Sequence, residues 1–465
     1  MKGFLLILSI LFSLFGFSQK KDSKSSVKSQ LKDFKVFKTE ILSNSAGIYF
    51  YTTKEQFQNE LDSLEAKLQT PQTEIEIFKI YSKCVASIHC GHTIIILKKM
   101  YDIFLKSRST LPFDVHYINK KLFIKNDYIG SFTRLINHTE ITSINGESIS
   151  DLTSYFSKFI SSDGTNQTHI NERMEFRFMF YYYFLKNQQT QFTIEYISER
   201  KDTLKSTLVA VFPKKEKIEK ESDYFNEIER HIDTLNNRAK LILPNPLPRN
   251  NTYKLQLDTF FVYLDQYSID NLIIDLRGNT GGLSQQYLTG FFCDSNYTYE
   301  YRTLKGLRKP NHYYQKPFDS QRLSIFCTRI ATRNGRTTTT KESEPNYPQF
   351  KGKIYILTDG WTFSAASNLT SILKEHSGAI TVGEETGGSY LKCSSGNLIL
   401  KLPKSKMQIK LNPMKYVNSV AVTEHKGGVL PTYEVKPSDK WDSDEDVQLQ
   451  FVYDLINNSQ TSSNK

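Results

Sequence analysis

The chain has 465 residues, a formal net charge of +11, 38% hydrophobic residues and 13% aromatic residues. This length predicts two or three domains, and the apolar content excludes a disordered chain. A basic balance is typical of nucleic-acid binding, but here the lysines are scattered, and glutamates interrupt the one local cluster at Lys214 to Lys220. We therefore expect no nucleic-acid partner.

The N-terminus has the order of a signal peptide. Met1-Lys2 is a basic start, residues 4–17 are mostly apolar, and Phe17-Ser18-Gln19 opens onto a polar chain. The apolar run is too short to span a bilayer comfortably. We predict a signal peptide at residues 1–18, an exported protein that is periplasmic or secreted, and no integral membrane span after cleavage. An uncleaved anchor is the alternative.

The cysteines show no metal-ligand spacing, and their number is odd, so an exported chain keeps at least one thiol free or paired with another molecule. They are Cys84, Cys90, Cys293, Cys327 and Cys393. His89 and His92 suggest a metal pair, but no third ligand stands at a recognisable spacing. We expect no metal and no cofactor.

Three successive patterns predict the domains before the core. After a polar linker at 19–29, residues 30–111 form a helical region, with helices expected at 30–44, 54–68 and 74–87. Residues 112–212 alternate like short strands, and an Asn-Gly turn within 135–149 resembles an element of PDZ-like domains. A helix is expected at 151–160, and strands at 191–197 and 205–211. The aromatic segment 171–185 is predicted to be a helix packed in the core.

The largest unit follows a charged linker at 213–223 and spans residues 224–457, before a flexible tail at 458–465. Helices are expected at 256–266 and 364–376, alternating with strands at 272–276, 354–357 and 379–382. Strands that alternate with helices favour a partly parallel α/β core.

Two segments of this core carry the chemistry. Residues 271–282 (NLIIDLRGNTGG) end in a glycine turn, and residues 353–367 (KIYILTDGWTFSAAS) place Ser364 where a strand enters a helix. A serine there is a helix cap in most chains. It can also be a nucleophile, because the helix dipole and the N–H of Ala365 would stabilise an oxyanion. Gly281 or Gly282 can supply a second N–H, since a glycine allows close approach of the backbone.

These segments resemble the "DLRxNxGG" and "TxSAAE/S" elements of the tail-specific (C-terminal-processing) and tricorn-type serine peptidase family. The resemblance covers most of the chain after the signal peptide. It implies a ClpP/crotonase-like protease core and hydrolysis of peptide bonds through an acyl-enzyme on Ser364, with Asp275, Arg277 and Asn279 holding the glycine loop.

The predicted base comes from a distant segment. Family members with a serine/lysine dyad carry their lysine where this chain has Ser389, and Lys392 is three residues too late. The segment Cys90 to Thr93 resembles the "GHT/SHT" element of the tricorn-like branch, and Glu424 to Pro431 resembles its "E-x-x-G-V-x-P-D" element, with Thr432 in place of the aspartate. This resemblance implies that His92 is the general base and Glu424 the supporting acid, which suits the chemistry of these groups.

The sequence therefore predicts an exported serine endopeptidase that acts on peptide or protein substrates; it does not define the oligomeric state. The substitutions at Ser389 and Thr432 keep a second hypothesis open, a catalytically inactive protease-like scaffold that binds peptides or other ligands. A crotonase-type acyl-CoA enzyme is disfavoured by the export signal and the PDZ-like region.

Overall fold

A computed structural model describes residues 23–127, 137–186, 189–213, 227–248, 250–282, 285–292, 299–303, 312–314, 338–340, 345–418, 420–421, 424–437 and 445–463. The predicted signal peptide, the lysine cluster at 214–220, and Cys293 and Cys327 lie outside the described residues.

The central sheet of the C-terminal half has six strands in the order β19-β14-β13-β10-β9-β8. In that order they span Tyr433–Glu434, Ile380–Gly383, Lys353–Thr358, Asn271–Asp275, Arg238–Ile242 and Glu229–Asp233. The strands from β19 to β9 pair in parallel, and the edge strand β8 pairs antiparallel with β9. All residues of β10 are buried, as expected for a parallel strand with both faces covered.

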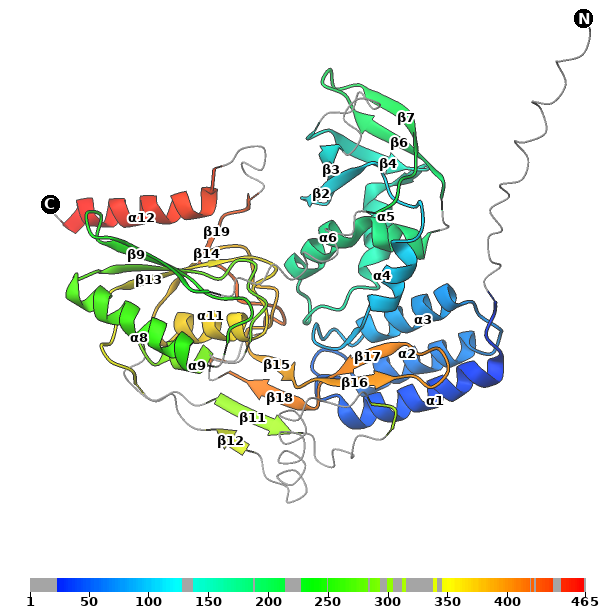
Figure 1. Ribbon diagram of the computed structural model, residues 1–465, viewed down its shortest axis with the longest axis horizontal. Coiled ribbons are helices and arrows are strands. Elements are labelled where there is room, and N and C mark those ends of the chain that lie inside the picture. The colour runs from blue at the N-terminus through cyan, green and yellow to red at the C-terminus, as the bar shows by residue number, and fades with distance from the viewer. Residues whose placement is uncertain are drawn as a thin grey trace, which may run out of the picture.

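Helices cover both faces of this sheet (Figure 1). On one face lie α8 (Asn251–Gln266), α9 (Gln285–Thr289) and α11 (Ala365–His376), and on the other lies α12 (Val447–Ser463). Leu272 and Ile274 of β10 belong to the apolar cluster shared with α8, α9 and α11. Ile273, which points to the opposite face, belongs to the cluster with Val452 and Ile456 of α12. The predicted α/β core is thus confirmed.

The N-terminal region is helical, as predicted. It contains α1 (Val27–Asn44), α2 (Lys54–Lys67), α3 (Glu74–Ala86) and the short α4 (Lys98–Phe104). Thr53 and Thr73 cap α2 and α3 with reciprocal capping boxes, which fix where these helices begin.

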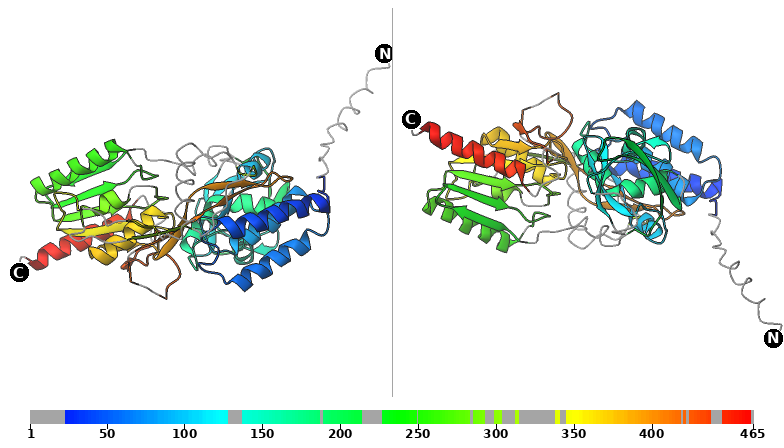
Figure 2. Two further views of the ribbon diagram at one scale, coloured as in Figure 1. Left: turned by 90° about the horizontal axis from the view of Figure 1, so that it is seen from below. Right: turned by 90° about the horizontal axis from the view of Figure 1, so that it is seen from above.

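A three-stranded sheet joins the N-terminal region to the C-terminal half of the chain. Strand β1 (Ile94–Ile95) follows α3 and pairs antiparallel with β17 (Gln408–Leu411), which pairs with β16 (Leu398–Lys401). Figure 2 shows β16 and β17, drawn in orange, reaching from the core across to the blue N-terminal helices. Leu400 and Ile409 are fully buried in the same apolar cluster as Phe37 of α1.

The β-rich unit holds a sheet in the order β2-β3-β4-β6-β7, with β5 paired to β4. These strands span Phe113–Ile118, Lys121–Asp127, Glu140–Ile144, Gln191–Ile197, Thr203–Val209 and, for β5, Glu147–Ser148. The predicted turn joins β4 to β5, where Asn145 and Gly146 both have positive φ. Helices α5 (Ile149–Ser157) and α6 (Thr168–Leu185) pack beside the sheet. The aromatic residues of α6 are buried from Phe178 onward, which confirms their predicted role in the core.

A fourth sheet, in the order β12-β11-β18-β15, lies at the edge of the core. Its strands span Thr338–Thr340, Tyr299–Thr303, Met414–Val417 and Lys392–Ser395.

Two predicted boundaries are wrong. The polar linker ends before residue 29, because α1 begins at Val27 behind the cap Ser26. The predicted flexible tail at 458–465 is helical as far as Ser463. Its polar residues have weak helix propensity, but they extend a helix already docked through Val452 and Ile456.

The surface and the thiols carry few special features. In the described part of the chain, no helix has the length and apolar character needed to cross a membrane.

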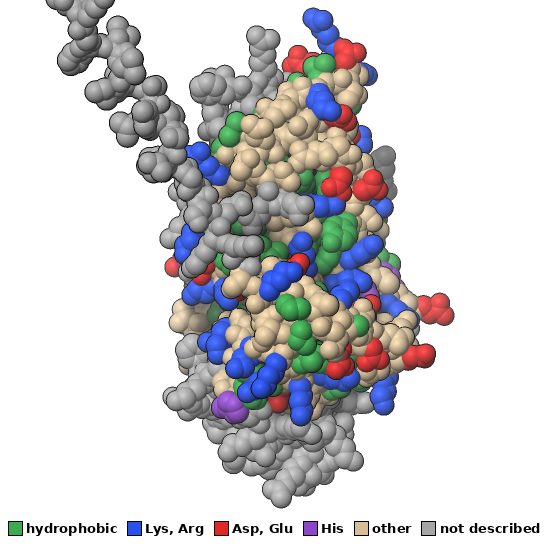
Figure 3. All heavy atoms as spheres, turned by 90° about the vertical axis from the view of Figure 1, so that its right-hand side faces the viewer, with side chains coloured by type: hydrophobic (Ala, Val, Ile, Leu, Met, Phe, Trp, Pro, Cys, Tyr) green, Lys and Arg blue, Asp and Glu red, His purple; other side chains and the backbone are tan. Residues whose placement is uncertain are grey.

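Cys84, Cys90 and Cys393 are buried free thiols. On the face shown in Figure 3, lysine and arginine side chains are spread among acidic and neutral ones.

Replacing a side chain inside the central sheet tests this layer order. Ile356 of β13 is fully buried, whereas Leu255 of α8 is 66% exposed. We expect Ile356→Ala to lower the free energy of unfolding by about 2–5 kcal/mol. Leu255→Ala should change it by less than about 0.5 kcal/mol. Chemical denaturation of both variants makes the measurement, and equal losses would contradict the arrangement.

Candidate active site

Ser364 lies where β13 turns into α11, with φ 53° and ψ −118°. Positive φ is uncommon outside glycine, and such strain is kept where the surrounding structure enforces it. Ser364 occupies the N-cap position, yet its side chain makes no capping hydrogen bond. The interpretation of Ser364 as a simple helix cap is therefore wrong, and its hydroxyl is directed elsewhere.

The hydroxyl of Ser364 faces His92. Nε2 of His92 lies 2.9 Å from Ser364 Oγ, although 272 residues separate them in the chain. The imidazole is 8% exposed. It packs against the ring of Phe363, with 4.6 Å between centroids. Its other nitrogen, Nδ1, is buried and has no hydrogen-bond partner among the described residues.

The backbone around His92 is held by the C-terminal half of the chain. Asn412 directly follows β17, and its Nδ2 donates to the carbonyl oxygen of His92 at 2.6 Å. The carbonyl oxygen of Asn412 accepts from Ala46 N at 2.7 Å, which ties the same residue to the end of α1. Both contacts are buried, so the position of the imidazole is set by pairing between distant segments.

Burial and, to a smaller extent, the nearby positive charge of Lys410 lower the pKa of His92 to about 3. Both effects disfavour the imidazolium form. The imidazole is consequently neutral at neutral pH, and Nε2 can accept a proton from the hydroxyl beside it.

The glycine loop after β10 is fastened to the turn that presents Ser364. Gly278 N donates to Asp359 Oδ2 at 2.9 Å, and Phe363 N donates to the carbonyl oxygen of Asn279 at 2.9 Å. Asp359 was not among the predicted site residues. Its sequence signal is the Asp-Gly pair at the end of β13, which is typical of any turn. The two motifs therefore form one hydrogen-bonded unit.

Side chains of the glycine loop hold it in place through ion pairs and hydrogen bonds. Arg277 makes a two-pronged ion pair with Asp275, with a shortest contact of 2.6 Å, and a second ion pair with Asp446 at the start of α12. Asn279 Nδ2 donates to the carbonyl oxygen of Pro244 at 3.0 Å. Asp275, Arg277 and Asn279 thus hold the loop to neighbouring segments through ion pairs and hydrogen bonds.

The two glycines differ in their surroundings. A Cβ on Gly281 would lie 2.6 Å from Ala365 N and 2.9 Å from Ser364 Cβ, so the space beside the nucleophile exists because this residue is glycine. The N–H of Gly281 donates to Asn279 Oδ1 at 3.0 Å. Since this N–H is engaged within the loop, Gly282 and Ala365 remain as the candidates among the predicted oxyanion donors.

The structure does not bring Glu424 to this pair. Its side chain is exposed, and no hydrogen bond or ion pair in the described part of the chain joins it to His92 or Ser364. Its neighbour His425 is paired instead with Glu385, at 2.9 Å.

A carboxylate other than that of Glu424 lies near His92. An oxygen of Asp163, a ring nitrogen of His92 and Cys90 Sγ all lie within 4.8 Å of one another, a spacing at which such donors can hold a metal ion. Backbone N–H groups already bind both oxygens of Asp163, and Ser364 already binds one nitrogen of His92. All three side chains thus already take part in hydrogen bonds within this region.

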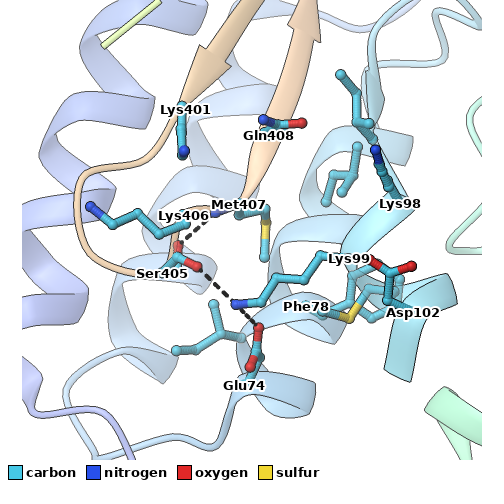
Figure 4. Close-up of a pocket in the computed structure, with 14 residues that line it drawn as sticks. Glu74, Phe78, Lys98, Lys99, Asp102, Lys401, Ser405, Lys406, Met407 and Gln408 are labelled. Atoms are coloured by element: carbon cyan, nitrogen blue, oxygen red, sulfur yellow. Dashed lines mark hydrogen bonds and ion pairs between the residues drawn. The ribbon is translucent and has the colours of Figure 1, made fainter. Parts of the chain in front are cut away.

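A separate pocket opens between α3, α4 and the β16–β17 hairpin (Figure 4), with a volume of about 250 Å³. Lys98, Lys99 and Lys401 stand around it, and Lys99 forms an ion pair with Glu74. None of the predicted site residues lines it. Its lining includes Ile95 of β1, so it adjoins the strand that follows His92.

Comparison with known proteins identifies the C-terminal half. Residues 247–435 match the model of Peptidase family S41. The chain carries an S41 peptidase domain. It is thus a serine peptidase, and the S41 domain contains Ser364, the glycine loop and Glu424. His92 lies outside the matched residues.

Solved structures agree with this assignment at the level of the fold. Mature CPAF complexed with lactacystin has a TM-score of 0.63 at 13% identity, covering 93% of this chain and 99% of that chain. Mature CPAF has a TM-score of 0.58 at 13% identity, and the alignment covers 88% of this chain and 92% of that chain. No curated protein matches the sequence significantly.

Alanine substitution of the glycine loop tests the space beside the nucleophile. Gly281 and Gly278 both have positive φ, but a Cβ on Gly278 would meet nothing within 4 Å. The two variants share the backbone strain and differ in contact with Ser364 and Ala365. We expect Gly281→Ala to lower kcat by about 10²–10³-fold, because the added Cβ would displace Ser364 and the N–H of Ala365, and displacing one oxyanion donor has an effect of this size.

The measurement is peptide hydrolysis by both variants at matched concentrations of folded protein. Gly278→Ala should keep most of the activity. Equal losses in the two variants would mean that backbone strain, and not the space beside Ser364, explains the effect.

Proposed function

We propose that this protein is an exported serine endopeptidase in which Ser364 is the nucleophile and His92 the general base. The observation that carries the proposal is the 2.9 Å separation of His92 Nε2 and Ser364 Oγ at a strand-to-helix turn. A serine hydroxyl needs such a base, since it is a weak nucleophile at its own pKa.

The reaction follows from this geometry. Ser364 Oγ attacks the peptide carbonyl carbon while its proton passes to Nε2 of His92. The negative charge that forms on the carbonyl oxygen is stabilised by the N–H groups of Ala365 and Gly282 and by the N-terminus of α11. The imidazolium then gives its proton to the leaving amine, and water releases the acyl group by the same route in reverse.

The glycine loop supports this assignment because it is rigid before substrate arrives. Arg277 fixes the loop to α12, and the N–H of Phe363 fixes it to the turn before Ser364. Donors that are already in position cost no reorganisation as charge develops, which is how an oxyanion site lowers a barrier.

A binding-only scaffold is the second candidate. It is favoured by the buried Nδ1 of His92, which lacks a partner, and by the exposure of Glu424, the acid that the resemblance implies. Against it stands the strained conformation of Ser364, which a scaffold has no reason to keep.

Export and peptide capture belong to the same proposal. The basic start and the apolar run of residues 4–17 support a signal peptide at 1–18 and a periplasmic or secreted enzyme. The β4–β5 hairpin with its Asn145-Gly146 turn supports the PDZ-like interpretation of residues 112–212, as a unit that binds a peptide end or gates access.

Removal of the nucleophile or the base tests the central claim. We expect Ser364→Ala and His92→Ala each to lower kcat on a quenched peptide library by about 10⁴-fold or more, since these groups act as one unit. Ser154→Ala, at an exposed serine of α5, is the matched control and should hydrolyse like the wild type.

The same proteins are then treated with a fluorophosphonate, which labels activated serines covalently. Labelling that disappears in Ser364→Ala and in His92→Ala supports the peptidase. A wild type that neither hydrolyses peptides nor takes up the probe would favour the binding-only scaffold.

A further inference from the structure

Asp163 is a buried carboxylate that the proposed reaction has not used. It lies between α5 and α6 and is 1% exposed. Its Oδ1 accepts a hydrogen bond from Gly91 N at 2.7 Å, and its Oδ2 accepts one from Ser389 N at 3.2 Å. A buried acid held by two backbone donors is costly to keep unless its charge is needed.

The location of Asp163 connects it to His92. One donor to its carboxylate is the residue directly before His92, and a carboxylate oxygen lies within 4.8 Å of a ring nitrogen of His92. Since Nε2 of that ring faces Ser364, Nδ1 is the nitrogen that has no partner.

We propose that Asp163 is the positioning residue of His92: it anchors the His92 segment through Gly91 N–H and provides the negative charge that stabilises the imidazolium formed when Ser364 loses its proton. The inference rests on the proposed function, in which His92 is the base. It gives to Asp163 the supporting role that the family resemblance assigns to Glu424.

Asp163 and Glu424 differ in how far their side chains are buried. Asp163 lies in the same water-excluded region as His92, whereas Glu424 is exposed. A charge acts strongly on a neighbouring group in a low-dielectric interior and weakly through water. The present separation exceeds a hydrogen bond, but hydrogen bonds of this kind are often long before substrate binds.

The position of the missing lysine is part of the same arrangement. Ser389, which stands there, is 3% exposed, and its backbone N–H binds Asp163. Its Oγ accepts a hydrogen bond from the Tyr51 hydroxyl at 2.7 Å. The segment that would supply a base in a dyad enzyme here holds the acid that serves a histidine base.

The titration of Asp163 agrees with this role. Burial raises the pKa of Asp163 to about 6, while the N–H donors of Gly91 and Ser389 oppose the rise. The carboxylate is thus charged at neutral pH and becomes protonated as the pH falls below about 6. The titratable groups that face Asp163 or His92 are Tyr51, Cys90, Cys393, His169 and Lys410.

The test is the rate of fluorophosphonate labelling of Ser364 as a function of pH, with a chelator present so that no metal occupies these donors. In the wild type we expect the rate to fall below about pH 6 as Asp163 is protonated. In Asp163→Asn we expect a labelling rate lower by about 10²-fold or more at pH 7.5. The fall in rate below about pH 6 should be absent from this variant. Asp163→Glu should recover part of the rate.

Two further variants sharpen the comparison. Asp62→Asn makes the same chemical change at an exposed site on α2 and should label like the wild type. Glu424→Gln tests the competing acid. If Asp163→Asn keeps the wild-type rate and pH profile while Glu424→Gln loses them, the inference is overturned. A wild type without Ser364-dependent labelling would instead refute the proposed function.

A second measurement covers the case in which Asp163→Asn does not fold, as judged by its thermal melt. In the wild type with ¹⁵N-labelled histidine, we expect the His92 ring to carry its proton on Nδ1 and its ¹⁵N shifts to move with a midpoint near pH 6. A His92 signal that is flat between pH 5 and 7 would overturn the inference without any variant.

Discussion

The structure depends on the pairing of β1 with β17. This short antiparallel contact, together with the Asn412 side chain that binds the carbonyl oxygen of His92, places a residue from the N-terminal region 2.9 Å from the serine of the S41 domain. A two-residue strand contributes few hydrogen bonds. Its position is secured because β16 and β17 bury Leu400 and Ile409 in the apolar cluster of the N-terminal helices.

Because of this pairing, residues from two regions of the chain contribute to the proposed site. In the proposed mechanism, the S41 domain supplies the nucleophile and the oxyanion donors after two adjacent parallel strands, whose carboxyl ends meet at one edge of the sheet. Position 389 of that domain is a serine and not a lysine. The proposed base, His92, comes from the N-terminal region, so a chain without that region would lack the group that is proposed to activate Ser364.

Local sequence signals predicted much of this structure. Strand β6 matches its predicted bounds, and the predicted bounds of α2 and α3 are within one residue of the observed ones, because apolar side chains at helical spacing mark this region. Ser364 and the glycine loop were found because each motif is contiguous. The meeting of His92 with Ser364 followed from a family resemblance and not from any local pattern.

What sequence reasoning missed is non-local. Asp163 and Asp359 are single carboxylates in turns, and nothing in their own segments distinguishes them from the acids of any other turn. They become significant only because folding buries Asp163 and brings backbone N–H groups to both carboxylates. The helical extension of α12 was missed for the related reason that docking of Val452 and Ile456 overrides weak local propensity.

The residue at position 389 bears on which kind of base the proposed site needs. A lysine base acts alone because it carries its own charge, whereas a neutral histidine becomes charged during the reaction and gains from a nearby anion. Replacing lysine by Ser389 leaves a backbone N–H and a small side chain, which Tyr51 and Asp163 occupy. The loop that carries Ser389 therefore takes part in the proposed site through its backbone N–H, which binds Asp163, and not through a basic side chain.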